Sequence, residues 1–269
     1  MSKIVDLTCV NEHDVFFRTV NMSASFANAM KRIIQADVCT MAIDTVHIEK
    51  NTTVIHNEEI ILALQLLPLT SEQVQLFSWP NDCQCEKGCK QCCVKFTLWV
   101  KEPGEITAKE LTSGNDHVQV TPFAKSCMIC KLNPGNELKL YAIAKRGCGS
   151  QHTKWNPTSI CTFWPDPQVY YKLPCKLSVD QKKELARICP GKVFDQETGV
   201  VVRPENCIYC MDCVTKVESW GLPDALFVES RVGTYRWHVR TRQNLSVRHC
   251  LRQATQVLIK KLQNLENSC

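Results

Sequence analysis

The chain has 269 residues, of which 44% are hydrophobic and 22% charged, and its formal net charge is +5. This length and composition indicate two or three compact globular units and exclude a disordered or fibrous protein. The longest apolar stretch, residues 60–69, is too short for a membrane span, which needs about 20 apolar residues. The opening residues lack the pattern of a secretory signal, so we expect none.

The first part of the chain predicts a strand, a helix, a second strand and a second helix. Residues 15–20 form a partly alternating run of β-type residues, and residues 41–54 are rich in β-branched side chains. Ser23 or Ser25 can cap the helix between them. The apolar face of that helix consists of Phe26, Ala27, Met30, Ile33 and Ile34. Residues 60–67 predict the second helix, which Pro68 ends.

Short β-type runs separated by proline, glycine and asparagine follow between about residues 96 and 163. The runs cover residues 95–100, 117–120 and 137–144, which predicts a mainly antiparallel sheet domain. Residues 193–202 predict a hairpin. Residues 245–265 predict a terminal amphipathic helix with Leu251, Ala254, Leu258, Leu262 and Leu265 on one stripe. Such a helix needs another surface to cover its apolar side.

Positive charge gathers near the end of the chain. No acidic residue lies between Glu229 and Glu266. The basic residues in this interval are Arg231, Arg236, Arg240, Arg242, Arg248, Arg252, Lys260 and Lys261. Either they form a solvated basic face or they contact nucleic acid or an acidic partner, and the sequence leaves the role of residues 231–252 open.

The 18 cysteines are the most unusual feature of the composition. Without an export signal we expect a reducing compartment, where clustered cysteines are more often metal ligands than disulfides. Four cysteines lie alone among apolar residues, and we expect them to be small buried hydrophobic residues. They are Cys9, Cys39, Cys161 and Cys250.

The first cluster places Cys83, Cys85, Cys89 and Cys92 within ten residues, with Gly88 available for a turn. Four thiolates can surround one Zn²⁺ as a tetrahedron, which leaves no position for a reactive water. Such a zinc ion is structural rather than catalytic. Cys93 is a fifth candidate, but neighbouring side chains in an extended segment point to opposite faces, and the spacing from Cys89 favours Cys92.

The second cluster consists of Cys207, Cys210 and Cys213, with Cys189 followed by Pro190 upstream. In ferredoxins with two clusters, the fourth cysteine of each Cys-x2-Cys-x2-Cys-x3-Cys-Pro run serves the other run's cluster. On that template the missing cysteines are replaced by Val179, Lys182, Leu185 and Val217. The four that remain all belong to one cluster. This pattern favours one 4Fe-4S cluster, with zinc in the same site or an empty module as the alternatives.

The other cysteines give weaker signals. Cys127, Cys130 and Cys175 are interpreted as ordinary thiols, although a role for them stays open. Cys148 and His152 suggest a nucleophile beside a base, but a glycine-rich loop need not bring them together, and no third orienting group is evident. We therefore expect a structural loop here.

Five parts of the chain, in order, carry a family resemblance. They are residues 27–34 continuing into 42–46 and 51–54, residues 64–69, the spacing from Cys83 to Cys92, residues 144–157, and residues 227–230. Together they resemble the alpha-like subunit of cellular RNA polymerases, the third-largest subunit of eukaryotic RNA polymerase II and its archaeal counterpart. Residues 147–157 are similar to the signature Gly-x-Gly-x-x-His-Ala-Lys-Trp-x-Pro, with Thr153 where alanine is usual. The zinc loop is eukaryotic in style, whereas the ferredoxin-like module is a feature of some archaeal members.

The resemblance implies an α+β fold and a non-catalytic assembly subunit of a DNA-directed RNA polymerase. Residues 1–45 and 225–269 would form a split dimerisation domain that pairs with a smaller alpha-like subunit. Residues 46–165, with a zinc loop at 83–93, would form an insert that docks the second-largest catalytic subunit and small zinc-binding subunits. Residues 170–224 would form the ferredoxin-like module. DNA would be met only through the complex, and the expected location is the nucleus, or the cytoplasm or a virion for an archaeal or viral chain.

The same resemblance, together with the apolar stripes, predicts partner contacts. The residues are Phe26, Asn28, Met30, Arg32, Ile33, His152, Lys154, Trp155, Leu251, Leu258 and Leu262. Two other classes of function compete with an assembly role. An electron-transfer protein would need a nucleotide or flavin site, and the chain has neither a Gly-x-Gly-x-x-Gly turn nor a phosphate loop. A free zinc-dependent nucleic-acid binder would need a finger followed by a recognition helix, which is also missing.

Overall fold

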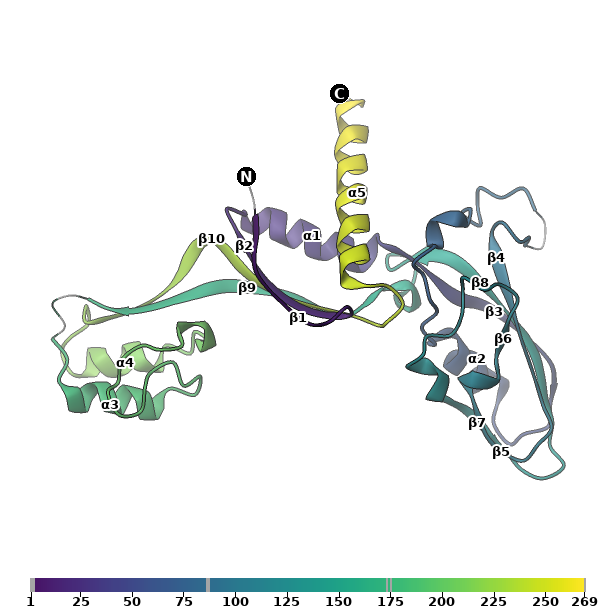
Figure 1. The fold of residues 1–269 in the computed structure, drawn as a ribbon, viewed down its shortest axis with the longest axis horizontal. Coiled ribbons are helices and arrows are strands. Elements are labelled where there is room, and N and C mark those ends of the chain that lie inside the picture. The colour runs from purple at the N-terminus through teal and green to yellow at the C-terminus, as the bar shows by residue number, and fades with distance from the viewer. Residues whose placement is uncertain (1–2, 86–87, 173, 175, 269) are drawn as a thin grey trace. The chain divides into compact units, whose positions relative to one another are not determined.

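The computed structural model describes residues 3–85, 88–172, 174 and 176–268 (Figure 1). Cys175 lies outside the described residues. The chain forms two compact units. One contains the residues up to 7 together with 16–27 and 163–237, and the other contains residues 8–15, 28–162 and those from 238 onward. Among the described residues, no helix is long and apolar enough to cross a membrane.

The described residues form a mixed α/β fold with antiparallel strand pairs and five helices. The helices are α1 (Ala24–Ala36), α2 (Asn57–Gln65), α3 (Val179–Ile188), α4 (Asp212–Ser219) and α5 (Val247–Glu266). The strands are β1 (Lys3–Asn11), β2 (Asp14–Val20), β3 (Cys39–Asn51), β4 (Cys93–Val100), β5 (Gly104–Thr107), β6 (Thr112–Ser113), β7 (Met128–Leu132), β8 (Leu138–Cys148), β9 (Thr158–Tyr171) and β10 (Leu226–Thr241). Their sheets have the orders β1-β2-β10-β9, β3-β8-β4-β6 and β5-β7.

The larger unit is built around the sheet β3-β8-β4-β6. β3 pairs with β8 in antiparallel register from Cys39 opposite Cys148 to Asn51 opposite Leu138. Alternate residues of the sheet's strands, such as Phe96 of β4, face a core to which α2 contributes Ile60 and Leu64. The pattern of alternating burial along β4 explains why the sequence predicted an antiparallel sheet here.

Most predicted elements are present within a few residues of their expected limits. β2, α1, β3, α2, β4, β8 and α5 are all confirmed. Serine caps start two helices: the Ser23 hydroxyl accepts the Phe26 N–H, and the Ser246 hydroxyl accepts the His249 N–H. The strand predicted at residues 117–120 is wrong, because the structure has only an isolated bridge between Leu69 and Val120 there.

The burial expected for the four isolated cysteines is confirmed for three of them. Cys39, Cys161 and Cys250 are buried, whereas Cys9 is exposed. The expectation for Cys9 is wrong because Cys9 lies in β1, the edge strand of its sheet, and almost every residue of β1 is exposed.

The segment predicted to be ferredoxin-like contains two helices and a hairpin. A capping box between Ser178 and Gln181 starts α3. The hairpin predicted at residues 193–202 closes through the bridge between Phe194 and Val201. α3 and α4 contribute Leu185 and Val217 to the core of this unit, where these side chains are 0% and 1% exposed. Two of the positions where a second cluster's cysteines would stand are therefore filled by close-packed apolar side chains.

Candidate metal centres

Four cysteine side chains converge in the loop before β4. The sulfur atoms of Cys83, Cys85, Cys89 and Cys92 all lie within 4.8 Å of one another. The Sγ–Sγ distances are 3.4 Å from Cys83 to Cys85, 3.6 Å from Cys83 to Cys89, and 3.4 Å from Cys85 to Cys92. Ligands about 2.3 Å from a tetrahedral zinc ion stand about 3.8 Å apart, so the four thiols fit around one ion of this kind.

The backbone of the loop sets this convergence. Gly88 adopts a φ of +91°, and a Cβ there would meet the Cys93 Sγ at 2.8 Å, so a side chain at this turn would disturb the loop. The Cys89 N–H donates to the Cys92 Sγ at 3.3 Å. A backbone hydrogen bond at Gln91, assisted by the Cys83 thiol, lowers the pKa of Cys89 to about 7. The loop thus favours the thiolate at Cys89, whereas the pKa values of Cys83 and Cys85 are raised by interactions with the neighbouring thiols.

Cys93 is the first residue of β4, and its side chain lies apart from the four converging thiols. Its Sγ donates to the Cys89 carbonyl oxygen at 3.3 Å and does not belong to the four-sulfur group. Burial, with smaller contributions from Cys92 and Cys89, raises its pKa to about 11. The structure therefore places Cys92 with the other ligands and Cys93 apart from them, as the spacing predicted.

The second cysteine cluster has a different geometry. Cys189, Cys207, Cys210 and Cys213 all line one cavity, together with apolar residues such as Val169 and Phe194. Among the described residues, however, only the first cluster brings its thiols within 4.8 Å of one another. The second set of thiols therefore lines a shared cavity without converging as closely as the first set does.

The loop that carries these cysteines is fixed to the neighbouring strands. Tyr209 and Met211, which lie between Cys207 and Cys213, have φ angles of +57° and +65°, in the left-handed region. The Arg236 guanidinium donates to the Glu205 carbonyl oxygen at 3.1 Å. The cavity of this loop is enclosed well enough that burial raises the pKa of Cys213 to about 11, with smaller contributions from the other three thiols.

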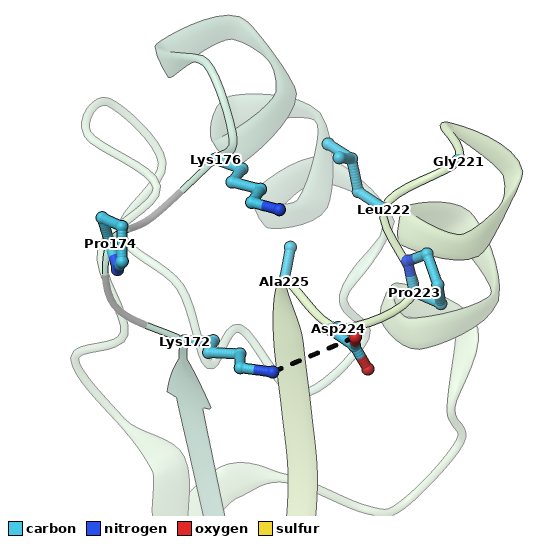
Figure 2. A pocket seen from close by; sticks show the side chains of 8 residues that line it. All are labelled: Lys172, Pro174, Lys176, Gly221, Leu222, Pro223, Asp224 and Ala225. Carbon is cyan, nitrogen blue, oxygen red and sulfur yellow. Dashed lines mark ion pairs between the residues drawn. The ribbon is translucent and has the colours of Figure 1, made fainter.

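A separate hollow lies at the base of the same unit (Figure 2). Its lining residues are Lys172, Pro174, Lys176, Gly221, Leu222, Pro223, Asp224 and Ala225. The Lys172 ammonium and the Asp224 carboxylate stand 3.9 Å apart as an exposed pair. Among the described residues that line this hollow, none is a histidine, a cysteine, a serine or a threonine.

Comparison with known proteins reveals similarity along almost the whole chain. A family model described as the RNA polymerase Rpb3/RpoA insert domain matches residues 42–161. The chain is 33% identical to DNA-directed RNA polymerase II subunit rpb3 of Dictyostelium discoideum, over 96% of this chain and 91% of that protein. It is 31% identical to DNA-directed RNA polymerase subunit Rpo3 of Methanosphaera stadtmanae, over 90% of each chain. The chain belongs to the Rpb3/RpoA family.

Membership of the Rpb3/RpoA family makes this chain a non-catalytic subunit of a DNA-directed RNA polymerase. The resemblance inferred from the sequence motifs is thereby confirmed. A third relative, subunit 3 of DNA-directed RNA polymerases II, IV and V of Arabidopsis thaliana, is 31% identical over 91% of this chain and 85% of that protein. The chain is thus similar to both eukaryotic and archaeal members.

The family signature at residues 147–157 forms an internal packing loop. The Lys154 side chain is only 7% exposed, and its ammonium pairs with the Asp44 carboxylate at 2.7 Å. The Trp155 ring is buried, its indole N–H donates to the Lys145 carbonyl oxygen, and it lies against Gly147. These two side chains were predicted as partner contacts. The structure shows that both have partners within this chain, and their contact with another subunit stays a prediction.

His152 of the same loop remains exposed. Its Nδ1 accepts the Lys154 N–H at 3.0 Å, and its ring stands edge-on to Trp155. The Cys148 thiol contacts the Ser150 hydroxyl at 3.1 Å. The side chains of Cys148 and His152 therefore have separate partners, which supports the structural interpretation of this loop over a nucleophile beside a base.

The remaining predicted contact residues differ in accessibility. Ile33 is only 6% exposed, so the chain's own core already covers most of it. Phe26 and Leu262 are 42% and 55% exposed. Asn28 and Arg32 are exposed, and Met30, Leu251 and Leu258 are partly buried. Ile259, which was not predicted, and Leu265, which was predicted on the apolar stripe but not as a contact, are 49% and 63% exposed on α5.

The basic stretch contains two ion clusters that sequence reasoning missed. The Asp166 carboxylate, whose residue is 2% exposed, lies 2.6 Å from the Arg236 Nε and 3.2 Å from the Arg18 Nη1. The Asp14 carboxylate accepts from Arg240 and from His238, and its pKa is lowered chiefly by the Arg240 hydrogen bond. Part of the basic stretch therefore neutralises buried carboxylates. The signal was present as single acidic residues within apolar strands.

Proposed function

We propose that this chain is the alpha-like assembly subunit on which a DNA-directed RNA polymerase is built, and that it forms a heterodimer with a smaller alpha-like subunit. The observation that carries the proposal is the similarity to polymerase subunit 3 over 96% of the chain. The subunit supplies surfaces rather than catalytic groups.

The heterodimer would form through a split domain of residues 1–45 and 225–269. α5 supports this assignment because three of its apolar side chains, Ile259, Leu262 and Leu265, are 49–63% exposed. A 20-residue helix with one apolar side is stable when another surface covers that side. Phe26 of α1, which is 42% exposed, is a further proposed contact residue.

The insert at residues 46–165 would dock the second-largest catalytic subunit and small zinc-binding subunits. The proposal rests on the match of residues 42–161 to the family's insert domain. We further propose that the thiolates of Cys83, Cys85, Cys89 and Cys92 bind one zinc ion, since their spacing fits a tetrahedron and uses every coordination position. Zinc would supply structural cross-linking of the loop at 83–93, which a segment with few apolar residues needs to hold one shape.

Residues 170–224 would form a ferredoxin-like module with one 4Fe-4S cluster. Cys189, Cys207, Cys210 and Cys213 would hold it, because these four residues share one cavity without meeting at a single point. A zinc ion in this site is the alternative and requires the thiols to move closer. The cluster would link α3, α4 and the loop before α4.

Coexpression with the smaller alpha-like subunit from the same source tests the dimerisation proposal. Native mass spectrometry should detect a one-to-one heterodimer, and the chain expressed alone should be less soluble because its α5 stripe is uncovered. A stable monomer that ignores that partner would contradict the proposal. We propose a nuclear location, which a fluorescent fusion in the source cell checks directly.

A further inference from the structure

Two cysteines outside both metal centres stand directly opposite each other across the β3–β8 ladder. Cys39 is the first residue of β3, Cys148 is the last residue of β8, and the two are register partners. Directly opposed residues in an antiparallel pair have Cα atoms about 4.5 or 5.5 Å apart and side chains on the same face. Disulfides need Cα atoms about 4.4–6.8 Å apart, so both kinds of ladder site satisfy this requirement.

The surroundings place both thiols on one face of the sheet. The Arg146 guanidinium, two residues before Cys148 on the same strand face, lies 3.7 Å from the Cys39 sulfur. The pKa of Cys39 is raised mainly by burial, and the Cys148 thiol contributes to that rise through electrostatic interaction. The register places the two cysteines opposite each other, and in the reduced form each sulfur has its own neighbour, Arg146 for Cys39 and Ser150 for Cys148.

The two thiols differ in accessibility, so the more exposed one is expected to react with an oxidant first. Cys148 is partly exposed at the start of a glycine-rich loop, and its sulfur lies 3.1 Å from the Ser150 hydroxyl. Cys39 is 7% exposed behind it. A small oxidant reaches Cys148 first, and Cys39 stands in the position of the second thiol that resolves the oxidised product.

We propose that Cys39 and Cys148 form a reversible disulfide when the chain meets hydrogen peroxide. The Cys148 thiolate attacks one peroxide oxygen, so that an S–O bond forms, the O–O bond breaks, and water leaves after protonation. The Cys39 sulfur then attacks the Cys148 sulfur. The S–S bond forms, the S–O bond breaks, and the departing hydroxyl takes the Cys39 proton as water. The two sulfur atoms together lose two electrons, and the peroxide oxygens gain them.

The disulfide would fasten the junction between α1 and β3 to the loop after β8. That junction already contacts the loop, because the Ser150 N–H donates to the Ala36 carbonyl oxygen at 2.9 Å. Gly149 also lies so close that a Cβ there would overlap the Gln35 carbonyl oxygen. The disulfide would add a covalent link between two segments that the reduced chain joins by hydrogen bonds. Reduced thiols in the cell would reverse it, as is usual for disulfides that form transiently in reducing compartments.

Disulfide mapping of the full-length chain tests the proposal. The reduced, metal-loaded protein is treated with a few equivalents of hydrogen peroxide, alkylated, digested and analysed by tandem mass spectrometry. We expect a peptide pair that joins Cys39 to Cys148, which disappears after dithiothreitol. Cys127 and Cys130 provide an internal control, because Cys130 is the register partner of Ile106 rather than of Cys127.

Two variants separate the steps. In Cys148→Ser, Cys39 should stay reduced under the same treatment and remain available to alkylation after unfolding. In Cys39→Ser, Cys148 should proceed beyond the sulfenic acid to the sulfinic acid, because no resolving thiol is present. The proposal is overturned if Cys148 of the parent chain becomes sulfinic acid while Cys39 stays reduced, or if the joined pair forms no faster than one between Cys127 and Cys130.

Discussion

Cys92 and Cys93 are chemically identical neighbours, and the start of β4 decides which one joins the four-sulfur group. Cys92 is buried among the other three sulfur atoms, whereas Cys93 is the first residue of the strand and hydrogen-bonds the Cys89 carbonyl oxygen. The spacing from Cys89 favoured Cys92, and it is the Cys92 sulfur that lies with the other three. The same physical rule, that adjacent extended residues point to opposite sides, accounts for it.

Replacing these two residues separately tests the proposed zinc site. Cys92→Ser should lose most of the bound zinc, because a neutral hydroxyl replaces one of four thiolates. Cys93→Ser should keep one zinc per chain. Zinc content after extensive dialysis, measured by inductively coupled plasma mass spectrometry, checks both. Equal zinc loss in the two variants would count against the assignment of Cys92.

Asp44 gives a residue-scale prediction about acid stability. Burial raises its pKa, but hydrogen bonds and attraction from Lys154 and Lys145 outweigh burial, so the net pKa lies below the ordinary value. A carboxylate with a lowered folded-state pKa stabilises the protein above its unfolded pKa of about 3.9, and this contribution is lost as the pH falls through the folded pKa.

Asp44→Asn should therefore destabilise the chain near neutral pH, by on the order of 1 kcal/mol once solvent screening is included. The difference between parent and variant should shrink toward zero below about pH 3. Urea unfolding midpoints of both proteins across this pH range supply the measurement. A difference that stays constant down to acid pH would show that the Asp44 charge is not its source.

At the scale of single elements, the N-terminal half of α5 is buried and its C-terminal half exposes apolar side chains. Its first half packs into the chain with Cys250 and Ala254, which are both 0% exposed. Its second half leaves Leu262 at 55% exposure. The helix is therefore anchored at one end and offers an apolar stripe at the other.

Leu262→Asp should weaken heterodimer formation at least tenfold while leaving the thermal midpoint of the isolated chain nearly unchanged. A buried leucine at an interface contributes about 1.5–3 kcal/mol, whereas an exposed one contributes little to folding. Leu62→Asp on α2 is a matched control, because Leu62 is 57% exposed and lies outside the proposed partner surface. Association constants from analytical ultracentrifugation should separate the two variants. Equal weakening by both would argue against the α5 surface.

The sequence predicted elements well where a periodic pattern and a local stop signal coincided. Pro68 after α2 supplied such a stop signal, and Ser23 before α1 and the alternating residues of β4 supplied further signals. The full lengths of β9 and β10 were not predicted, because their side chains alternate only in part and their partners are distant in sequence.

The candidate sites were likewise predictable where their residues are close in sequence, and not where they are distant. The four thiols before β4 are close in sequence, so their spacing was sufficient. Lys154 and Trp155 carried a family signature, but only the three-dimensional structure places them inside the chain, because Asp44 and Lys145 are distant in sequence. The opposed pair of Cys39 and Cys148 is visible only through the β3–β8 register.

At the scale of the whole molecule, the chain combines two proposed metal centres with different geometry. Anaerobically purified protein should contain one zinc and four irons and should absorb broadly in the visible range. Cys210→Ser should lower the iron content and destabilise residues 170–224 while the zinc content stays at one. Cys127→Ser is the control, because Cys127 is an exposed thiol outside both centres. Zinc alone in the anaerobic parent protein would reject the iron–sulfur proposal.

The central claim is that this chain works as an assembly subunit of an RNA polymerase. The most direct measurement is affinity purification of the tagged full-length chain from its source cells, followed by quantitative mass spectrometry. We predict recovery of a smaller alpha-like subunit and of the two largest polymerase subunits in amounts equal to the chain, with RNA synthesis activity in the purified complex. Recovery of the chain without polymerase subunits, under conditions that keep the enzyme intact, would contradict the account.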